Sequence, residues 1–310
     1  MNKQLLYFSA VMLIFLFSCT TDDFDTKEKE KTVDFTIATS IPAEIRTYSS
    51  SNEGGVRNVD NTQFNLRYIL EVWTKEPSRK LAWRDYKIVT ENFETANVVF
   101  SASLLAQKYD FVFWADFVNK TATEENAANA DLYYNTNNEE NDGLQAIQMK
   151  EPYAAGETRD AFFAVVKDVD LAVSSHLDKV SLNRPFGKYR LIAADSPAAD
   201  DPAYVTIDYQ GNLPAGFNAL TDEIIPGVII NAPSYRVDDV QHETVSIEGK
   251  SADAYILACD YIFTSDLTPT TIAFTANVYN SSGEVIGYRT ISGFPVERNE
   301  LTTVYGNFFY

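Results

Sequence analysis

The chain has 310 residues and a formal net charge of −19, with 44 acidic against 25 basic residues. Such an acidic surface repels the phosphates of nucleic acids and anionic lipid headgroups, so the composition excludes nucleic acid as a partner class. At roughly 100 to 200 residues per domain, the length suggests two domains.

The first 18 residues have the layout of a secretory signal peptide. Lys3 precedes an almost unbroken apolar run over residues 5–17, and the small Ser18 leads to Cys19. The apolar run is too short to span a bilayer, because a spanning helix needs roughly 20 apolar residues. We therefore expect residues 1–18 to be removed.

Residues 16–19, LFSC, resemble a bacterial lipobox, in which the cysteine is lipidated and becomes the first residue of the mature protein. This resemblance implies a covalent lipid on Cys19, with palmitate among its acyl chains, and no other cofactor. Each buried methylene of an acyl chain contributes about 0.8 kcal/mol, so several chains hold a soluble domain firmly to a bilayer. The alternative is an ordinary signal peptide followed by an incidental cysteine.

Residues 19–31 are expected to form a tether. The sequence after the cysteine, TTDDFDTKEKEK, is charged and holds one aromatic residue, so it cannot bury enough apolar surface to order itself. Acidic residues directly after the cysteine also resemble the signal that sends lipoproteins to the outer face of the outer membrane in Bacteroides-like bacteria. This implies a lipid anchor in the outer membrane at the cell surface. The alternative is a solvated linker without a sorting signal.

The second cysteine, Cys259, has no partner within the chain once Cys19 carries a lipid. The protein would then pass through an oxidising compartment without a structural disulfide, so its stability must come from sizeable cores. We expect Cys259 to be a small buried residue in a strand.

Alternation of polar and apolar residues predicts β-strands through the mature chain. In FNLRYILEVW, residues 64–73, a period of two places one face on a core. In YDFVFWADF, residues 109–117, both faces are apolar, which predicts a central strand covered on both sides. Residues 271–291 predict a hairpin that turns at residues 280–283.

Turn signals separate these strands and no helical crossovers intervene, so the pattern favours β-sandwiches. We place an N-terminal β-sandwich domain at residues 32–175 and a C-terminal β-sandwich domain at residues 176–310. The Asn- and Glu-rich residues 119–141 are expected to form a long loop of the first domain.

Six short motifs resemble the fimbrillin-like lipoproteins of Bacteroides-like bacteria, in the order of that family. They are YDFVFWADF (109–117), DLYYNT (131–136), RDAFFAV (159–165), VSLNRPFGKYRLIAAD (180–195), GFNALTDEI (216–224) and FPVERNELTTVYGNFFY (294–310). The resemblance implies an all-β fold of two tandem transthyretin-like β-sandwich domains. It also implies a fimbrial (pilus) subunit or accessory lipoprotein of the cell surface, as stalk, tip or anchor, that supports adhesion.

The same resemblance implies assembly with other fimbrial subunits by β-strand addition. In fimbrillins of this type an arginine-specific protease removes the first strand, and the emptied groove accepts an extended strand from the next subunit. Here the displaced strand would be TVDFTIATSI, with Val33, Phe35 and Ile37 facing inward. Cleavage would follow Arg46, with Arg57 as the less favoured site. The alternative is an uncut first strand, as in anchors and some tip subunits.

The donor strand would be the C-terminal segment NELTTVYGNFFY, residues 299–310, which alternates and is rich in Thr, Val, Tyr and Phe. Its candidate pairing residues are Leu301, Thr303, Val304, Tyr305 and Phe308. The alternative is an ordinary last strand.

The sequence favours a protein that is not an enzyme. Its two histidines, His176 and His242, are 66 residues apart and lack the spacing of a metal-binding motif. Neither a GxSxG elbow nor a phosphate-binding or dinucleotide-binding glycine loop is present. We expect no catalytic residue and no metal, while a zinc site of histidine and carboxylates stays open as an alternative.

A second function class is a surface lipoprotein that binds glycans or other ligands and does not polymerise. Most of the 18 Tyr, 20 Phe and 3 Trp residues follow the core alternation of strands. The exceptions are Tyr133, Tyr134, Tyr153 and Tyr235. We consider these loop aromatics candidate contacts for a host or microbial surface ligand.

Overall fold

The computed structural model describes residues 31–42, 59–75, 77–137, 143–150, 157–238, 240–247 and 250–309. These residues lie mostly in β-strands, with only single turns of 3₁₀ helix, so the expected all-β fold class is confirmed. Residues from Thr32 to Tyr310 belong to one compact unit. The expected signal peptide, residues 1–18, lies outside the described residues, as do Cys19, Arg46, Arg57 and Tyr153.

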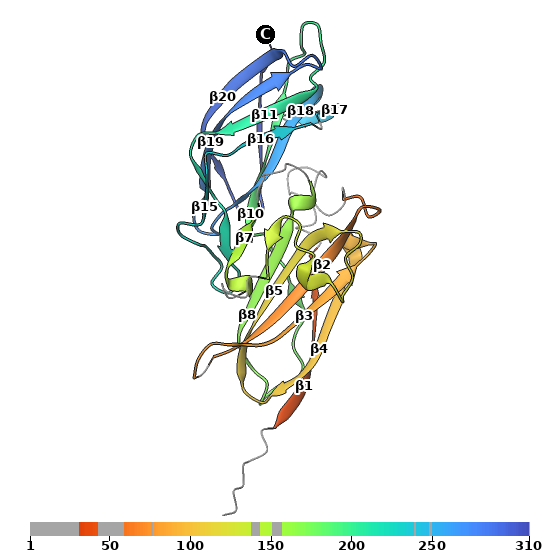
Figure 1. Ribbon diagram of the computed structural model, residues 1–310, viewed down its shortest axis with the longest axis vertical. Coiled ribbons are helices and arrows are strands. Elements are labelled where there is room, and N and C mark those ends of the chain that lie inside the picture. The colour runs from red at the N-terminus through yellow and green to blue at the C-terminus, as the bar shows by residue number, and fades with distance from the viewer. Residues whose placement is uncertain are drawn as a thin grey trace, which may run out of the picture. The chain divides into compact units, whose positions relative to one another are not determined.

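The first sandwich consists of two sheets (Figure 1). Its strands are β1 (Thr32–Ser40), β2 (Phe64–Thr74), β3 (Leu81–Val89), β4 (Val98–Leu105), β5 (Lys108–Asn119), β8 (Ala161–Asp170) and β9 (Val180–Ser181). One sheet has the order β3-β2-β5-β8, and the other has the order β4-β1-β9. In the second sheet β1 runs antiparallel to β4 and parallel to β9.

The central strand β5 is buried on both faces, as its sequence predicts. Phe111 and Phe113 belong to the core between the two sheets of the first sandwich. Val112 and Trp114, which point to the opposite face, belong to a second and larger core. Because successive side chains of a strand alternate between faces, this one strand joins two cores.

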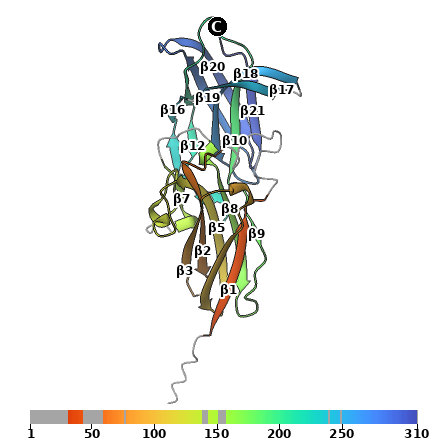
Figure 2. The same cartoon turned by 90° about the vertical axis from the view of Figure 1, so that its right-hand side faces the viewer.

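The second sandwich also has two sheets, ordered β17-β18-β10-β21 and β16-β11-β19-β20 (Figure 2). Its strands are β10 (Phe186–Ala193), β11 (Tyr204–Tyr209), β16 (Ser234–Val237), β17 (Gln241–Ile247), β18 (Lys250–Phe263), β19 (Thr270–Tyr279), β20 (Val285–Val296) and β21 (Leu301–Gly306). The hairpin of β19 and β20 turns where the sequence predicts, with Gly283 at a φ of +80°.

The two sandwiches repeat one topology that has no obvious counterpart in the sequence. Each first strand, β1 or β10, lies between an antiparallel partner, β4 or β18, and the parallel last strand, β9 or β21. The facing sheets also correspond. The order β3-β2-β5-β8 in the first sandwich matches the order β16-β11-β19-β20 in the second. The hairpin strand β17 is an addition to the second sandwich.

Each sandwich carries an insertion at a different place in this order. In the first sandwich residues 120–160 separate β5 from β8 and include η4 (Ala127–Asn129), β6 (Tyr134–Asn135), η6 (Gly143–Gln145), β7 (Ile147–Met149) and η7 (Glu157–Arg159). In the second sandwich residues 210–233 separate β11 from β16 and include β12 (Asn212–Pro214), β13 (Gly216–Asn218), β14 (Glu223–Ile224) and β15 (Ile229–Asn231). One further turn, η3 (Phe93–Thr95), precedes β4.

The two insertions form a sheet together, in the order β14-β13-β7-β6. Gly216 and Phe217 of β13 pair with Gln148 and Ile147 of β7. Likewise β9 pairs with β1 although it follows residue 175, where the sequence places the domain boundary. That boundary stays a prediction, and these pairings join residues from its two sides.

Candidate functional site

The first strand, β1, contributes to the core of the first sandwich. Phe35 and Ile37 are each 1% exposed, as the alternation predicts, while Val33 is half-buried. The Phe35 ring makes edge contacts with Phe111 and Trp83, with ring centroids 5.2 and 5.8 Å apart. Removal of β1 would therefore expose apolar side chains of the facing sheet, β3-β2-β5-β8.

The two sides of β1 are paired very unequally. On one side Thr32 to Thr39 pair in continuous register with β4. On the other side β9 pairs only with Thr39 and Ser40, and an isolated bridge joins Thr36 to His176. Over most of its length, β1 is held within the sheet by one neighbour among the described residues.

Within the part of the chain that the structure describes, the last strand, β21, lies at the edge of its sheet and pairs with β10 alone. Leu301, Thr303 and Val304 are half-buried, and Tyr305 is 41% exposed. An edge strand presents unpaired backbone groups on its outer side, which can pair with another chain.

The residues after β21 fix the end of the chain to the other sheet. The carboxylate of Asp195 accepts hydrogen bonds from the backbone N–H groups of Phe308 and Phe309, at 2.8 and 3.0 Å. Phe308 is 2% exposed and Phe309 forms a bridge to Gly287 of β20. A Cβ at Gly287 would lie 2.1 Å from the carbonyl oxygen of Phe308, so the close approach requires glycine.

The structure corrects two of the proposed ligand-contact aromatics. Tyr134 is fully buried, and its hydroxyl donates to the carbonyl of Arg159. Tyr235 is 5% exposed, and its hydroxyl lies 2.8 Å from that of Tyr189. Neither ring can contact a ligand from the surface. Tyr133 is half-buried and its hydroxyl forms a hydrogen bond with Thr158 at 2.7 Å.

Other aromatic residues that belong to strands are half-buried or exposed, and the sequence did not indicate them. Tyr204 and Tyr279, on neighbouring strands, stack with ring centroids 4.6 Å apart. The guanidinium of Arg236 lies 3.5 Å from the centre of the Tyr204 ring. Tyr288 on β20 is 54% exposed.

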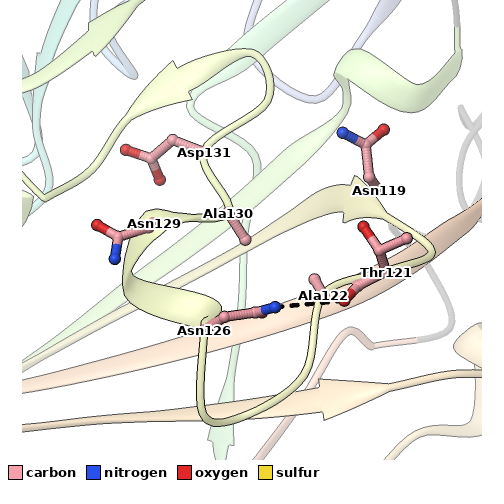
Figure 3. A pocket seen from close by; sticks show the side chains of 7 residues that line it. All are labelled: Asn119, Thr121, Ala122, Asn126, Asn129, Ala130 and Asp131. Atoms are coloured by element: carbon pink, nitrogen blue, oxygen red, sulfur yellow. Dashed lines mark hydrogen bonds between the residues drawn. The ribbon is translucent and has the colours of Figure 1, made fainter.

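A polar pocket of about 350 Å³ opens beside the end of β5 (Figure 3). It is lined by Asn119, Thr121, Ala122, Asn126, Asn129, Ala130 and Asp131. All seven residues belong to the segment that the sequence predicts as a long loop. The Asn126 amide donates to the Thr121 carbonyl at 3.3 Å, the bond drawn as a dashed line in Figure 3.

A buried arginine organises this segment. Arg67 of β2 is fully buried and donates to both carboxylate oxygens of Asp116, at 2.9 and 2.7 Å. It also donates to the Ala127 carbonyl at 2.7 Å and to Asp131 at 2.8 Å. Thr136 donates its hydroxyl and its backbone N–H to the Asp131 carboxylate. One guanidinium thus fixes residues 127–136 on the sheet.

Burial and charge act against each other in this ion pair. Burial lowers the pKa of Arg67, and Asp116 and Asp131 raise it by more, so the guanidinium stays charged. Burial raises the pKa of Asp116 above its ordinary value, and Arg67 opposes that rise. The arginine therefore limits how far burial raises the pKa of this carboxyl.

A second buried polar cluster lies where the first insertion meets the second sandwich. Arg159 of η7 forms an ion pair with Asp260 of β18, and both are buried. Tyr209 donates to Asp260 at 2.9 Å, and its hydroxyl lies 2.8 Å from that of Tyr189. Burial, and then the charge of Asp260, raises the pKa values of these tyrosines well above the ordinary value.

The described residues contain no cluster of three or more His, Cys, Asp or Glu side chains that could hold a metal ion. Within the same residues, no helix is long and apolar enough to cross a membrane. Cys259 lies in a strand, as expected, and is half-buried rather than buried.

Comparison with known proteins gives one family. A model described as a family of unknown function (DUF6562) matches residues 25–310. No curated protein matches the chain.

Several solved structures resemble this one. A candidate adhesin from Bacteroides thetaiotaomicron is 13% identical, with 82% of this chain and 79% of that chain covered at a TM-score of 0.47. A candidate cell adhesion protein from Bacteroides fragilis is 10% identical, with 87% and 92% covered at 0.45. The fimbrial anchor protein Mfa2 from Porphyromonas gingivalis is 10% identical, with 84% and 83% covered at 0.39.

Proposed function

This chain belongs to the DUF6562 family of unknown function, and we propose that it is a cell-surface fimbrial subunit or accessory lipoprotein that supports adhesion and assembles by strand addition. The observation that carries the proposal is the unequal pairing of β1, which completes a core and yet has one extensive neighbour in its sheet. The motifs that resemble fimbrillin-like lipoproteins support the same function.

The burial free energy of the β1 side chains is consistent with a strand that another subunit can replace. Full burial of an apolar side chain contributes about 1.5–3 kcal/mol, so the loss of Phe35 and Ile37 would leave a groove that strongly favours refilling. A strand from another subunit would restore the backbone pairing with β4 and place alternate side chains in the vacated positions. Only a cut in the chain after β1 would make this exchange possible without unfolding the sandwich.

Two arginines stand in the sequence between β1 and β2. Arg46 is the proposed cleavage site and Arg57 the secondary one. The proposed donor is the segment 299–310, whose strand β21 already lies at a sheet edge. To act as a donor it would have to leave β10 and the contacts of Asp195 with its backbone.

The experiment uses protein that begins at Cys19, since the compact unit starts only at Thr32. The protein is treated with an arginine-specific protease and examined by intact mass and by electrophoresis without boiling. We expect one early cut after Arg46, followed by a ladder of detergent-resistant oligomers. Excess synthetic peptide 299–310 should suppress the ladder by filling the groove, while a scrambled peptide should not.

An Arg46→Lys variant is the matched control, because it keeps the charge and removes the cleavage site. It should stay monomeric under the same treatment. A wild-type protein that is cut after Arg46 and yet remains a monomer would refute assembly by exchange of β1. A protein that is not cut selectively would be assigned to the anchor or ligand-binding class.

We also propose that the lipid on Cys19 holds the protein at the outer membrane. Growth with a palmitate analogue that can be detected chemically should label the wild-type protein and not a Cys19→Ser variant. Fractionation should then move the variant out of the membrane fraction. Equal labelling of both proteins would contradict the assignment of Cys19.

A further inference from the structure

The pocket beside β5 presents polar groups that the protein itself does not use. The side chains of Asn119, Thr121 and Asn129 are exposed and form no hydrogen bond with another described residue. Figure 3 shows Asn119 and Asn129 on opposite sides of the opening. Each amide offers both a donor and an acceptor, and the hydroxyl offers both as well.

These groups are held by a rigid support. The Asn65 side chain, which is 1% exposed, donates to the carbonyls of Lys120 and Ala122 at 3.1 and 3.0 Å. Asn126 accepts from the backbone N–H of Thr123 at 2.8 Å and thus holds the turn below the pocket. The buried Asn65 and the exposed Asn126 therefore position the rim before any ligand arrives, which lowers the entropic cost of binding.

The charge of the lining selects against ionic ligands. None of the seven lining residues is basic, so an anion would find no counter-charge in a chain of formal net charge −19. The one carboxylate, Asp131, already accepts from Arg67 through one oxygen and from the backbone N–H of Thr136 through the other. It is therefore not available as a free ligand for a cation.

We propose that this pocket binds a neutral sugar residue, either as a free sugar or within a polysaccharide. Amide and hydroxyl groups that donate and accept at once match the hydroxyl groups of a sugar, and a volume of about 350 Å³ accommodates a single ring with its substituents. The inference goes beyond the assembly described above and does not depend on it, because the pocket is complete within one chain.

The test uses uncut monomer that begins at Cys19, so that a failure of strand exchange cannot affect it. Calorimetric titration and saturation-transfer NMR are carried out with D-mannose, D-galactose and N-acetyl-D-glucosamine. N-acetylneuraminic acid and inorganic phosphate serve as anionic probes. We expect at least one neutral sugar to bind and both anions to bind more weakly.

Two substitutions locate the binding site. The double variant Asn119→Ala with Asn129→Ala should raise the Kd of the best sugar about tenfold, since each lost hydrogen bond weakens binding several-fold. Both side chains are exposed, so the thermal midpoint should not change. Asn212→Ala, at an exposed asparagine of β12 outside the pocket, is the matched control and should bind as the wild type does.

The outcomes are distinct. Absence of binding by all three neutral sugars, tighter binding of either anion, or equal affinity of the wild type and the double variant would overturn the proposal. If the proposal holds, titration with linear oligosaccharides of the best sugar separates the two sources. Tighter binding of the oligosaccharide identifies a polysaccharide, and equal binding identifies the free sugar.

Discussion

Replacement of Arg67 by methionine tests how the pocket segment is held. Methionine fills a similar space but leaves Asp116, which is 1% exposed, as a buried carboxylate without its cation. Removing one partner of a buried ion pair costs about 3–5 kcal/mol, because the remaining charge cannot recover its hydration. The hydrogen bonds to Ala127 and Asp131 are lost in the same substitution. We expect a destabilisation in that range.

The loss should depend on pH, and the sign follows from Asp116. Burial already raises the pKa of this carboxyl, and without Arg67 it rises further. A folded state that binds a proton more tightly than the unfolded chain loses stability as pH rises. The variant should therefore be closest to the wild type in mild acid and furthest from it at neutral pH and above.

Urea denaturation followed by tryptophan fluorescence, at pH 5 and pH 8, measures both effects. The double variant Arg67→Met with Asp116→Leu removes both charges and should recover most of the loss. Arg67→Lys keeps the charge and cannot donate to both oxygens in a fork, so it should lie between the wild type and Arg67→Met. A loss below about 1 kcal/mol for Arg67→Met, or a double variant no more stable than the single one, would refute the reasoning.

Three further substitutions test other parts of the fold. Phe35→Ala removes a ring that is 1% exposed, and urea denaturation should give a loss of about 3–5 kcal/mol. Gly287→Ala places a methyl group 2.1 Å from the Phe308 carbonyl oxygen, so thermal unfolding should give a loss of about 1–3 kcal/mol. A hydrogen bond to Asp201 raises the pKa of Tyr255 from 10.0 to about 12, so its contribution to stability is retained below pH 10 and lost as pH rises through 12. Denaturation between pH 9 and 12 should show a smaller fall in Tyr255→Phe. Unchanged midpoints in the first two variants, or an unaltered alkaline fall in the third, would contradict these expectations.

The parts of the fold that the sequence predicts are those governed by local alternation. The inward side chains of β1, the two-sided burial of β5 and the turn between β19 and β20 follow from a period of two and from turn residues. These features depend on neighbours in the chain, so a single sequence contains the information.

Prediction from alternation was wrong for a face of β2 that an insertion covers. In β2 the polar Arg67 and Glu71 share a face with Trp73, and a period of two would place that face in solvent. All three are buried, because residues of the first insertion lie over them, with Leu144 donating its backbone N–H to Glu71. The sequence shows two charged residues on a strand, and it does not indicate which residues cover them.

The prediction that Tyr134 and Tyr235 contact a ligand was wrong for a related reason. Tyr134 stands in a polar stretch, yet its ring packs against Trp114 and Phe186, with ring centroids 5.5 and 5.6 Å away. These contacts depend on pairing between segments far apart in the sequence, and such pairing cannot be read from one chain. The pocket was missed because its asparagines looked like ordinary loop residues.

The sheet that the two insertions form together affects the order in which parts of the chain can fold. The ring of Phe163, in β8, packs against Phe217 of β13 at a centroid distance of 4.8 Å. A chain that leaves the membrane N-terminus first can form β5 and β8 before residue 217 is available to pair. Until then, the apolar face of the first sandwich is exposed to solvent. A chaperone that recognises exposed aromatic residues would bind to this face during that interval.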